Sequence, residues 1–140
     1  MTVEVSQASS PFHAGEQQAQ ARGLSYRVAS YHFGFIARAI AMRRTEGFFK
    51  ILVTDDEQMK VLGMRAVGEH ASSAIQAVAL LISMDLGIEE LAELIHPHPS
   101  IIEGVQECVR MLRGKSIFKP STIALSLVCR RFHDGQYSKL

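Results

Sequence analysis

The sequence has few cysteines and no cysteine motif. Its 140 residues contain two, Cys108 and Cys129, which form neither a Cys-x-x-Cys redox motif nor the ligand spacing of a zinc site. Two cysteines are too few for a disulfide scaffold, so we interpret both as reduced thiols. Cys108 lies among apolar residues at helical spacing and is expected to be a small buried side chain.

Targeting and membrane-spanning segments are also missing from the sequence. The N-terminus has no basic start followed by an apolar run, so no secretory signal is visible. No apolar segment approaches the length that crosses a bilayer. We therefore expect a cytoplasmic protein without a membrane partner.

Charge of one sign is not in excess. The sequence contains fifteen Lys and Arg residues and fourteen Asp and Glu residues, so its net charge is +1. Nucleic acids and acidic membranes are bound by clustered basic faces. The only local concentrations, Arg43-Arg44 and Arg130-Arg131, are interpreted as solvated turn or tail residues, so we expect no nucleic-acid partner.

The composition, with 47% hydrophobic and 21% charged residues, fits one globular domain. Residues 1–14 are polar and small, which predicts a poorly ordered leader. A short helix is expected over 16–22, ended by Gly23. Residues 26–33 predict a strand, and 37–42 a weaker second strand.

The clearest β signal is a hairpin, in which the strands 48–53 and 60–67 are separated by an acidic loop. Phe49, Ile51 and Val53 share one face of the first strand, which is the apolar face. Gly63 is expected to mark a bulge or a close approach.

Helical periodicity replaces the β pattern after residue 70. Helices are predicted from 70 to 87, from 88 to 95 and from 101 to Gly114. Because the strands come first and the helices afterwards, the fold class is α+β, with an antiparallel sheet of three to four strands covered on one face by about three helices. Residues 123–129 could be strand or helix, and Asp134-Gly135 is a turn signal.

The most informative stretch is His96-Pro97-His98-Pro99-Ser100-Ile101-Ile102-Glu103. His98 precedes a proline and is therefore held in an extended conformation, and histidine titrates near neutral pH. Ser100 and Glu103 have the spacing of a capping box. Alternatively, Glu103 turns back to the His98 imidazole and fixes its tautomer. Spacing does not separate these alternatives.

The two histidines could also join a metal site, because alternate residues of an extended segment point the same way. No third ligand is evident near His96 and His98, and zinc needs three or four converging groups. We therefore expect no metal. The remaining histidines are interpreted as surface or partly satisfied residues.

A family resemblance rests on this turn and on the elements before it. The segments that carry it are Glu16 to Gly23, Arg38-Ala39, Thr45 to Leu52 with its Gly-Phe-x-Lys strand, Val61-Leu62-Gly63 and His96 to Glu103. Together they resemble the C-terminal dimerisation domain of flavoprotein disulfide reductases, closest to dihydrolipoamide dehydrogenase. The resemblance covers about residues 15–119 and leaves 120–140 as a divergent C-terminal tail.

The resemblance implies specific roles. In the family the domain pairs across a two-fold axis, and the second histidine of the turn reaches the redox disulfide and flavin of the opposite subunit. By position, His98 is then the general acid and base, Glu103 orients its ring, and Pro99 follows a cis peptide bond. The thiolate is the reactive form of a thiol, so an imidazole that takes and returns its proton accelerates exchange.

The departures from the family are equally informative. The chain lacks the Gly-x-Gly-x-x-Gly fingerprint and a redox cysteine pair, so it should bind neither FAD nor NAD(P) alone. Residues 1–14 do not resemble the strand that usually precedes Glu16. The resulting prediction is a detached interface domain, expected as a homodimer, which is inactive alone and is completed by a chain carrying the flavin and nicotinamide domains. The alternative is a non-catalytic homodimerisation module or vestigial fragment.

Overall fold

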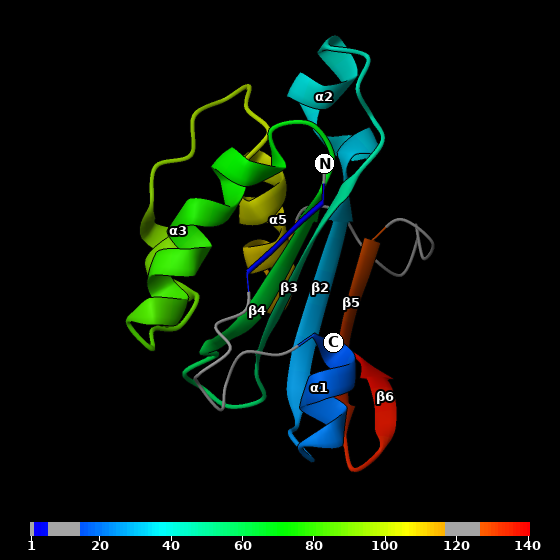
Figure 1. Ribbon diagram of the computed structural model, residues 1–140, viewed down its shortest axis with the longest axis vertical. Helices are drawn as coiled ribbons and strands as arrows, with labels where there is room; N and C mark the ends of the chain where they lie inside the picture. The colour runs from blue at the N-terminus through cyan, green and yellow to red at the C-terminus, as the bar shows by residue number, and fades with distance from the viewer. Residues whose placement is uncertain (1, 6–14, 117–126) are drawn as a thin grey trace.

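A single antiparallel sheet is the centre of the fold. The computed structural model describes residues 2–5, 15–116 and 127–140. Within them, six strands lie in the order β1-β4-β3-β2-β5-β6 (Figure 1). The strands are β1 (Thr2–Val5), β2 (Tyr26–His32), β3 (Phe48–Thr54), β4 (Val61–Val67), β5 (Leu127–His133) and β6 (Gln136–Lys139). The predicted α+β class is confirmed, and the sheet is larger than expected.

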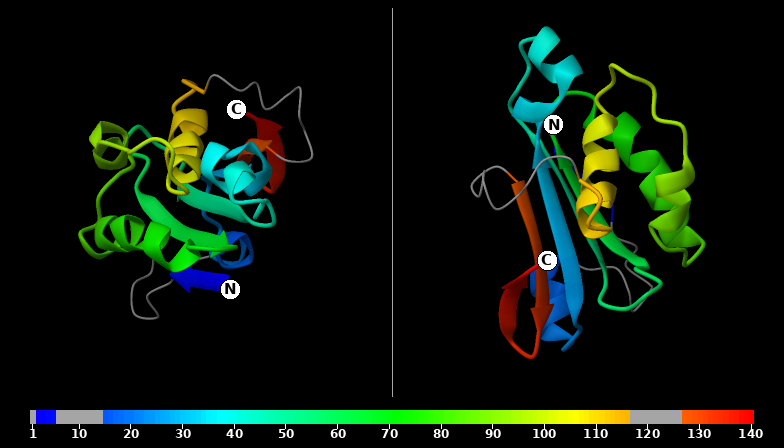
Figure 2. Two further views of the ribbon diagram at one scale, coloured as in Figure 1. Left: turned by 90° about the horizontal axis from the view of Figure 1, so that it is seen from above. Right: turned by 180° about the vertical axis from the view of Figure 1, so that it is seen from behind.

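Helices cover both faces of this sheet unequally. Helix α3 lies against β4 and β1, and α5 against β2 and β3 (Figure 2). The helical elements are α1 (Glu16–Ala21), the 3-10 helix η1 (Phe33–Phe35), α2 (Ala37–Ala41), α3 (Ala71–Ser83), α4 (Glu89–Glu93) and α5 (Glu103–Leu112). None of the helices in the described residues is long and apolar enough to cross a bilayer.

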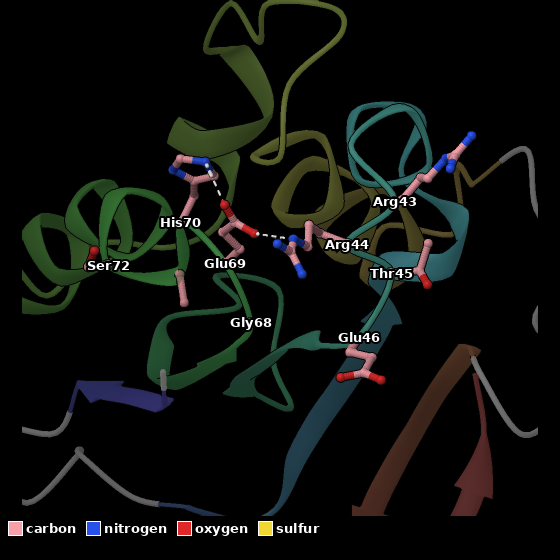
Figure 3. A pocket seen from close by; sticks show the side chains of 9 residues that line it. Arg43, Arg44, Thr45, Glu46, Gly68, Glu69, His70 and Ser72 are labelled. Atoms are coloured by element: carbon pink, nitrogen blue, oxygen red, sulfur yellow. Dashed lines mark ion pairs between the residues drawn. The ribbon is translucent and has the colours of Figure 1, made fainter.

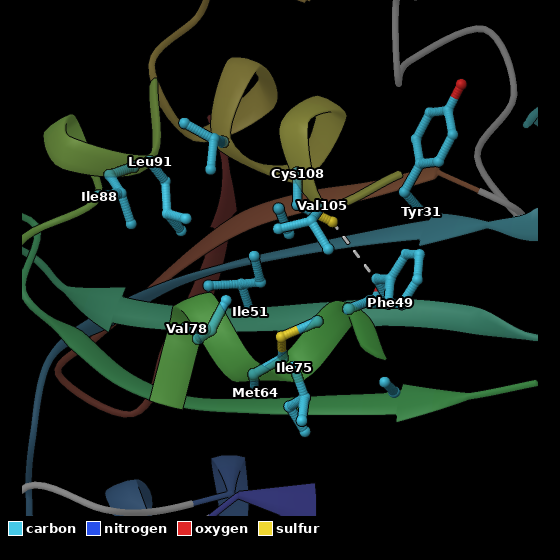
Figure 4. Close-up of a cluster of buried hydrophobic side chains, with 14 of the residues drawn as sticks. Tyr31, Phe49, Ile51, Met64, Ile75, Val78, Ile88, Leu91, Val105 and Cys108 are labelled. Atoms are coloured by element: carbon cyan, nitrogen blue, oxygen red, sulfur yellow. Dashed lines mark hydrogen bonds between the residues drawn. The ribbon is translucent and has the colours of Figure 1, made fainter. Parts of the chain in front are cut away.

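Alternation along β3 separates two hydrophobic clusters, because successive strand residues point to opposite faces. Phe49 and Ile51 are fully buried on the side of α3 and α5 (Figure 4). Leu52 points the other way and packs with Val28 and with Ala19 of α1. The larger cluster therefore lies beneath α3 and α5, and α1 covers only part of the opposite face.

The predicted second strand over 37–42 is wrong, because Ala37–Ala41 is one turn of helix. Alternation over so few residues does not distinguish a strand from a helix. Three of the five residues are alanine, the strongest helix former. Ile36 and Ala39 are buried three residues apart, which matches a helical period.

The two ends of the chain also differ from expectation. Thr2–Val5, predicted as part of a poorly ordered leader, is a strand paired with β4, while residues 6–14 lie outside the described residues. β5 begins within the ambiguous run 123–129, whose first four residues are likewise not described.

The C-terminal residues are part of the sheet. β5 pairs with β2, and β6 pairs with β5. The predicted turn at Asp134-Gly135 is confirmed: both residues have positive φ, 47° and 80°, as a two-residue hairpin loop requires. Arg130 and Arg131 are not solvated tail residues, since they form ion pairs with Glu16 and Asp55.

Candidate functional site

The histidine turn lies between α4 and α5. Helix α4 ends where Leu94 takes an extended conformation, with ψ of 145°. The next residue, Ile95, is 95% exposed, and the peptide bond between His98 and Pro99 is cis. The chain then enters α5 at Glu103. The turn is thus held between two helix ends.

His98 and Glu103 are in direct contact. The Nδ1–H of His98 donates to Glu103 Oε1 at 2.6 Å. The imidazole is 69% exposed, whereas the carboxylate is 23% exposed. The arrangement therefore fixes one ring nitrogen and leaves the side chain open to solvent.

The second carboxylate oxygen of Glu103 has a different partner. Oε2 accepts the backbone N–H of Ser100 at 2.8 Å, which is the reach-back half of a capping box. The Ser100 hydroxyl oxygen is buried and has no hydrogen-bond partner among the described residues. The spacing left two alternatives open for Glu103, a capping box or a contact with the His98 imidazole. The Glu103 carboxylate makes both contacts, one with each oxygen, although the serine half of the capping box is missing among the described residues.

The residue after Glu103 sets how closely α5 approaches the sheet. A Cβ on Gly104 would lie 2.6 Å from Ile36 Cδ1 and 2.6 Å from Phe49 Cδ2. Only a glycine lets the first turn of α5 contact these buried side chains without displacement. The sequence reading missed Gly104 and Ile36, although a glycine near the start of an otherwise amphipathic helix is a signal of close packing.

His96 does not share a site with His98 in the described part of the chain. Its Nδ1–H donates to the carbonyl of Leu94 at 2.9 Å. No group of three His, Cys, Asp or Glu side chains placed to hold a metal ion is found among residues 2–5, 15–116 and 127–140.

The two thiols are structural. Cys108 is fully buried, and its Sγ–H donates to the Phe49 carbonyl at 3.8 Å (Figure 4). Burial raises the pKa of the Cys108 thiol strongly, and burial likewise raises that of Cys129 to about 11. Both are free, and as protonated thiols they are poor nucleophiles.

A cleft of about 610 Å³ opens between the end of α2 and the start of α3 (Figure 3). Arg44, which lines it, pairs with Glu69 at 3.3 Å, and His70 Nε2 lies 3.9 Å from the same carboxylate. The Arg44 side chain is 69% exposed, in agreement with the solvated turn that the sequence predicts.

The geometry of the turn permits one kind of chemistry. With Nδ1–H committed to Glu103, the other ring nitrogen, Nε2, is the proton acceptor of the neutral imidazole. A carboxylate beside the ring stabilises the imidazolium that forms when Nε2 takes a proton. Such a pair is suited to general acid–base catalysis on a group brought by another molecule.

Comparison with known proteins identifies the family. Residues 14–109 match the family described as pyridine nucleotide-disulphide oxidoreductase, dimerisation domain. The chain belongs to this family. It is a dimerisation domain of the dihydrolipoyl dehydrogenase-like disulfide oxidoreductases.

Similar proteins come from several organisms. The chain is 30% identical over 104 residues to dihydrolipoyl dehydrogenase 3 of Haloarcula marismortui, covering 74% of this chain and 22% of that protein. It is 35% identical over 109 residues to a mercuric reductase of Lysinibacillus sphaericus, covering 78% and 20%. This dimerisation domain therefore spans about a fifth of the length of the curated relatives that it matches.

A solved structure gives the same result. The Cu(II) complex of the HOCl-induced flavoprotein disulfide reductase RclA from Escherichia coli superimposes with a TM-score of 0.66 and 25% identity. The match covers 71% of this chain and 22% of the reductase.

Proposed function

We propose that this dimerisation domain supplies an acid–base pair, His98 and Glu103, to thiol–disulfide exchange at an interface with another chain. The observation that carries the proposal is the 2.6 Å contact between His98 Nδ1 and Glu103 Oε1 on an imidazole that is 69% exposed. A base whose ring is oriented by a residue of its own chain and is exposed to solvent can react with a group that another molecule brings.

In the proposed step, His98 Nε2 removes the proton of a substrate thiol. The resulting thiolate attacks one sulfur of a disulfide carried by the partner, forming a mixed disulfide and releasing the second sulfur as a thiolate. Return of the proton from His98 to a departing thiolate restores the neutral imidazole. Glu103 holds Nδ1–H throughout and offsets the positive charge of the intermediate imidazolium.

The disulfide, FAD and NAD(P) belong to the partner in this proposal. The buried, protonated thiols of Cys108 and Cys129 do not fit a redox pair. When bound, the flavin would pass electrons between the nicotinamide and the partner's disulfide. The chain alone is accordingly inactive, and its free thiols suit a cytoplasmic location.

Exposed apolar side chains at the end of α3 and beside the turn support association. Leu80 of α3 and Met84, which follows its last residue, are each 58% exposed, and Leu94 and Ile95 beside the turn are 51% and 95% exposed. Exposed apolar groups on one side of a domain favour a protein partner. We propose that this side forms a homodimer, or an interface with the chain that carries the flavin.

Complementation tests the proposal. The chain is mixed with a dihydrolipoyl dehydrogenase from which the dimerisation domain has been removed, and NADH-dependent lipoamide reduction is measured. We expect activity that neither component has alone and that His98→Ala abolishes. His96→Ala is the matched control and should retain activity, since His96 bonds to the Leu94 carbonyl and to no other group among the described residues.

A second function remains if the chemistry fails. A stable complex or homodimer that gives no activity with any variant would favour the non-catalytic dimerisation module instead, because exposed Leu80, Met84 and Ile95 support association whether or not His98 reacts. Sedimentation of the chain alone at tens of micromolar, a concentration that detects roughly micromolar affinities, measures the homodimer directly.

A further inference from the structure

Three of the six strands in the described residues lie outside the segment that matches the family. Residues 14–109 contain β2, β3 and β4, whereas β1, β5 and β6 come from outside the match. Without β5, the β2 strand would present an unpaired edge, which is a template for a strand from another polypeptide. In this chain β5 occupies that edge from the pair Tyr26↔Phe132 to the pair Tyr31↔Leu127.

Aromatic and charged contacts attach the β5–β6 hairpin to the domain. Phe132 stacks on Tyr26, with ring centroids 5.1 Å apart and planes 18° apart. The Tyr137 hydroxyl donates to Glu16 Oε2 at 2.9 Å, and Arg130 donates to the same oxygen at 3.0 Å. The Arg130 guanidinium also lies 4.0 Å from the Tyr137 ring centroid. The hairpin is thus bonded to α1 as well as to β2.

A second anchor lies on the loop that follows β3. Asp55 accepts from Arg27 of β2 at 2.7 Å and pairs with Arg131 of β5 at 2.9 Å. Its side chain is only 10% exposed. One carboxylate therefore joins three elements, β2, β5 and the β3–β4 loop, and opening the hairpin would leave it with one cation fewer.

The outer strands of the described sheet are poor templates for pairing. β1 and β6 have four residues each, and Lys139 of β6 is exposed. Short edge strands that carry charge discourage edge-to-edge association.

We propose that the β5–β6 hairpin closes the β2 edge within this chain, so that the partner docks on a preformed sheet and does not add a strand to it. This inference rests on the proposed function for the identity of the partner, a chain carrying the flavin and nicotinamide domains. It assigns the docking to the side of α3 and the histidine turn, where the exposed Leu80 and Ile95 lie.

Hydrogen exchange on the full-length chain alone tests the closure. Alternate β2 amides point to β3 and to β5, so each edge of β2 reports separately. We expect the amides bonded to β5 to exchange within about tenfold of those bonded to β3. Exchange of the β5-facing amides that is about a thousandfold faster would mean that the hairpin is open, and would overturn the inference.

Substitutions sharpen the measurement. Phe132→Ala removes the stacking on Tyr26 and should accelerate the β5-facing amides about tenfold or more while leaving the β3-facing amides unchanged. Tyr137→Phe, which loses only the hydroxyl contacts, is the milder variant if the first unfolds. Ile40→Ala on α2, a side chain that is 52% exposed and lies outside the proposed docking surface, is the control that should alter neither set. Equal acceleration of both sets by Phe132→Ala would contradict a separate edge closure.

Mixing with the truncated dehydrogenase tests the mode of docking. We expect the β5 amides that bond to β2 to keep their protection in the complex, while protection increases in α3 and the turn. Loss of protection in β5 on mixing would show that a partner strand displaces the hairpin, against the inference. If no complex forms, the proposed function fails, whereas the exchange of the isolated chain still decides whether the edge is closed.

Discussion

Two glutamates begin two helices of this domain but have different kinds of partner. Glu16 is the first residue of α1, and Glu103 is the first residue of α5, where a carboxylate complements the helix dipole. Glu16 is 13% exposed and binds Lys50 and Arg130, which belong to β3 and β5. Glu103 binds His98, whose ring is mostly exposed.

The partners of the two carboxylates indicate a structural role for Glu16 and a chemical role for Glu103. All the partners of Glu16 are groups of the same chain, so its charge is neutralised inside the domain. The two oxygens of Glu103 bind the Ser100 backbone N–H and the His98 imidazole, which is 69% exposed. A carboxylate that polarises an exposed group is the better candidate for function.

The largest expected effect comes from His98→Ala. In the complemented complex we expect a loss of activity of about 10²- to 10⁴-fold, the range of a general acid–base group. Because the side chain is 69% exposed, the free energy of unfolding should change by no more than about 0.5 kcal/mol. Lipoamide reduction and urea unfolding check the two expectations; a large loss of stability would mean that the turn is structural.

Much of the fold is predictable from the sequence because the deciding signals are local. Phe49, Ile51 and Val53 lie on one apolar face of their strand, and Gly23 ends α1 with a φ of 66°. Asp134-Gly135 specifies a two-residue turn without reference to the rest of the chain. The helices that cover the sheet follow from three- and four-residue spacing.

The unpredicted parts depend on contacts that are distant in sequence. Arg130 meets Glu16 across 114 residues, and no local pattern reports such a pair. The same holds for Gly104 against Phe49. At the site, spacing limits Glu103 to two partners, and coordinates are needed to see that it contacts both Ser100 and His98.

The comparison between the carboxylates is tested by one substitution at both positions. Glu16→Gln should reduce the free energy of unfolding by about 2 kcal/mol, because charge-assisted hydrogen bonds from Lys50 and Arg130 are weakened in a mostly buried site. Glu103→Gln should cost less than about 1 kcal/mol, since the imidazole that it contacts is 69% exposed. Chemical denaturation of both variants measures the difference. Equal losses would remove the distinction between the two carboxylates.

Packing at Gly104 gives a comparable but coupled effect. Gly104→Ala should destabilise the domain by about 1–3 kcal/mol, because its Cβ would lie 2.6 Å from Phe49 and Ile36. Phe49→Leu in the same chain makes room, so the double variant should lose less stability than the sum of the single ones. Additive losses in a double-mutant cycle would indicate that the helix moves away without contact. An intact turn in the double variant is checked by its activity in the complex.

The smallest expected effect is a pH dependence that belongs to Glu16. Burial alone would raise the pKa of this carboxyl, but hydrogen bonds from Lys50, Tyr137 and Arg130 outweigh it and hold the pKa below the ordinary value of 4.5. The unfolded chain therefore binds the proton more readily, so the contribution of Glu16 to stability is complete above about pH 5 and is lost as the pH falls through the lowered pKa. Urea unfolding from pH 7 to pH 3 should show wild-type stability falling more steeply below pH 5 than that of Glu16→Gln, since the amide does not titrate. Parallel curves for the two proteins would mean that the donors around Glu16 do not favour its charged form.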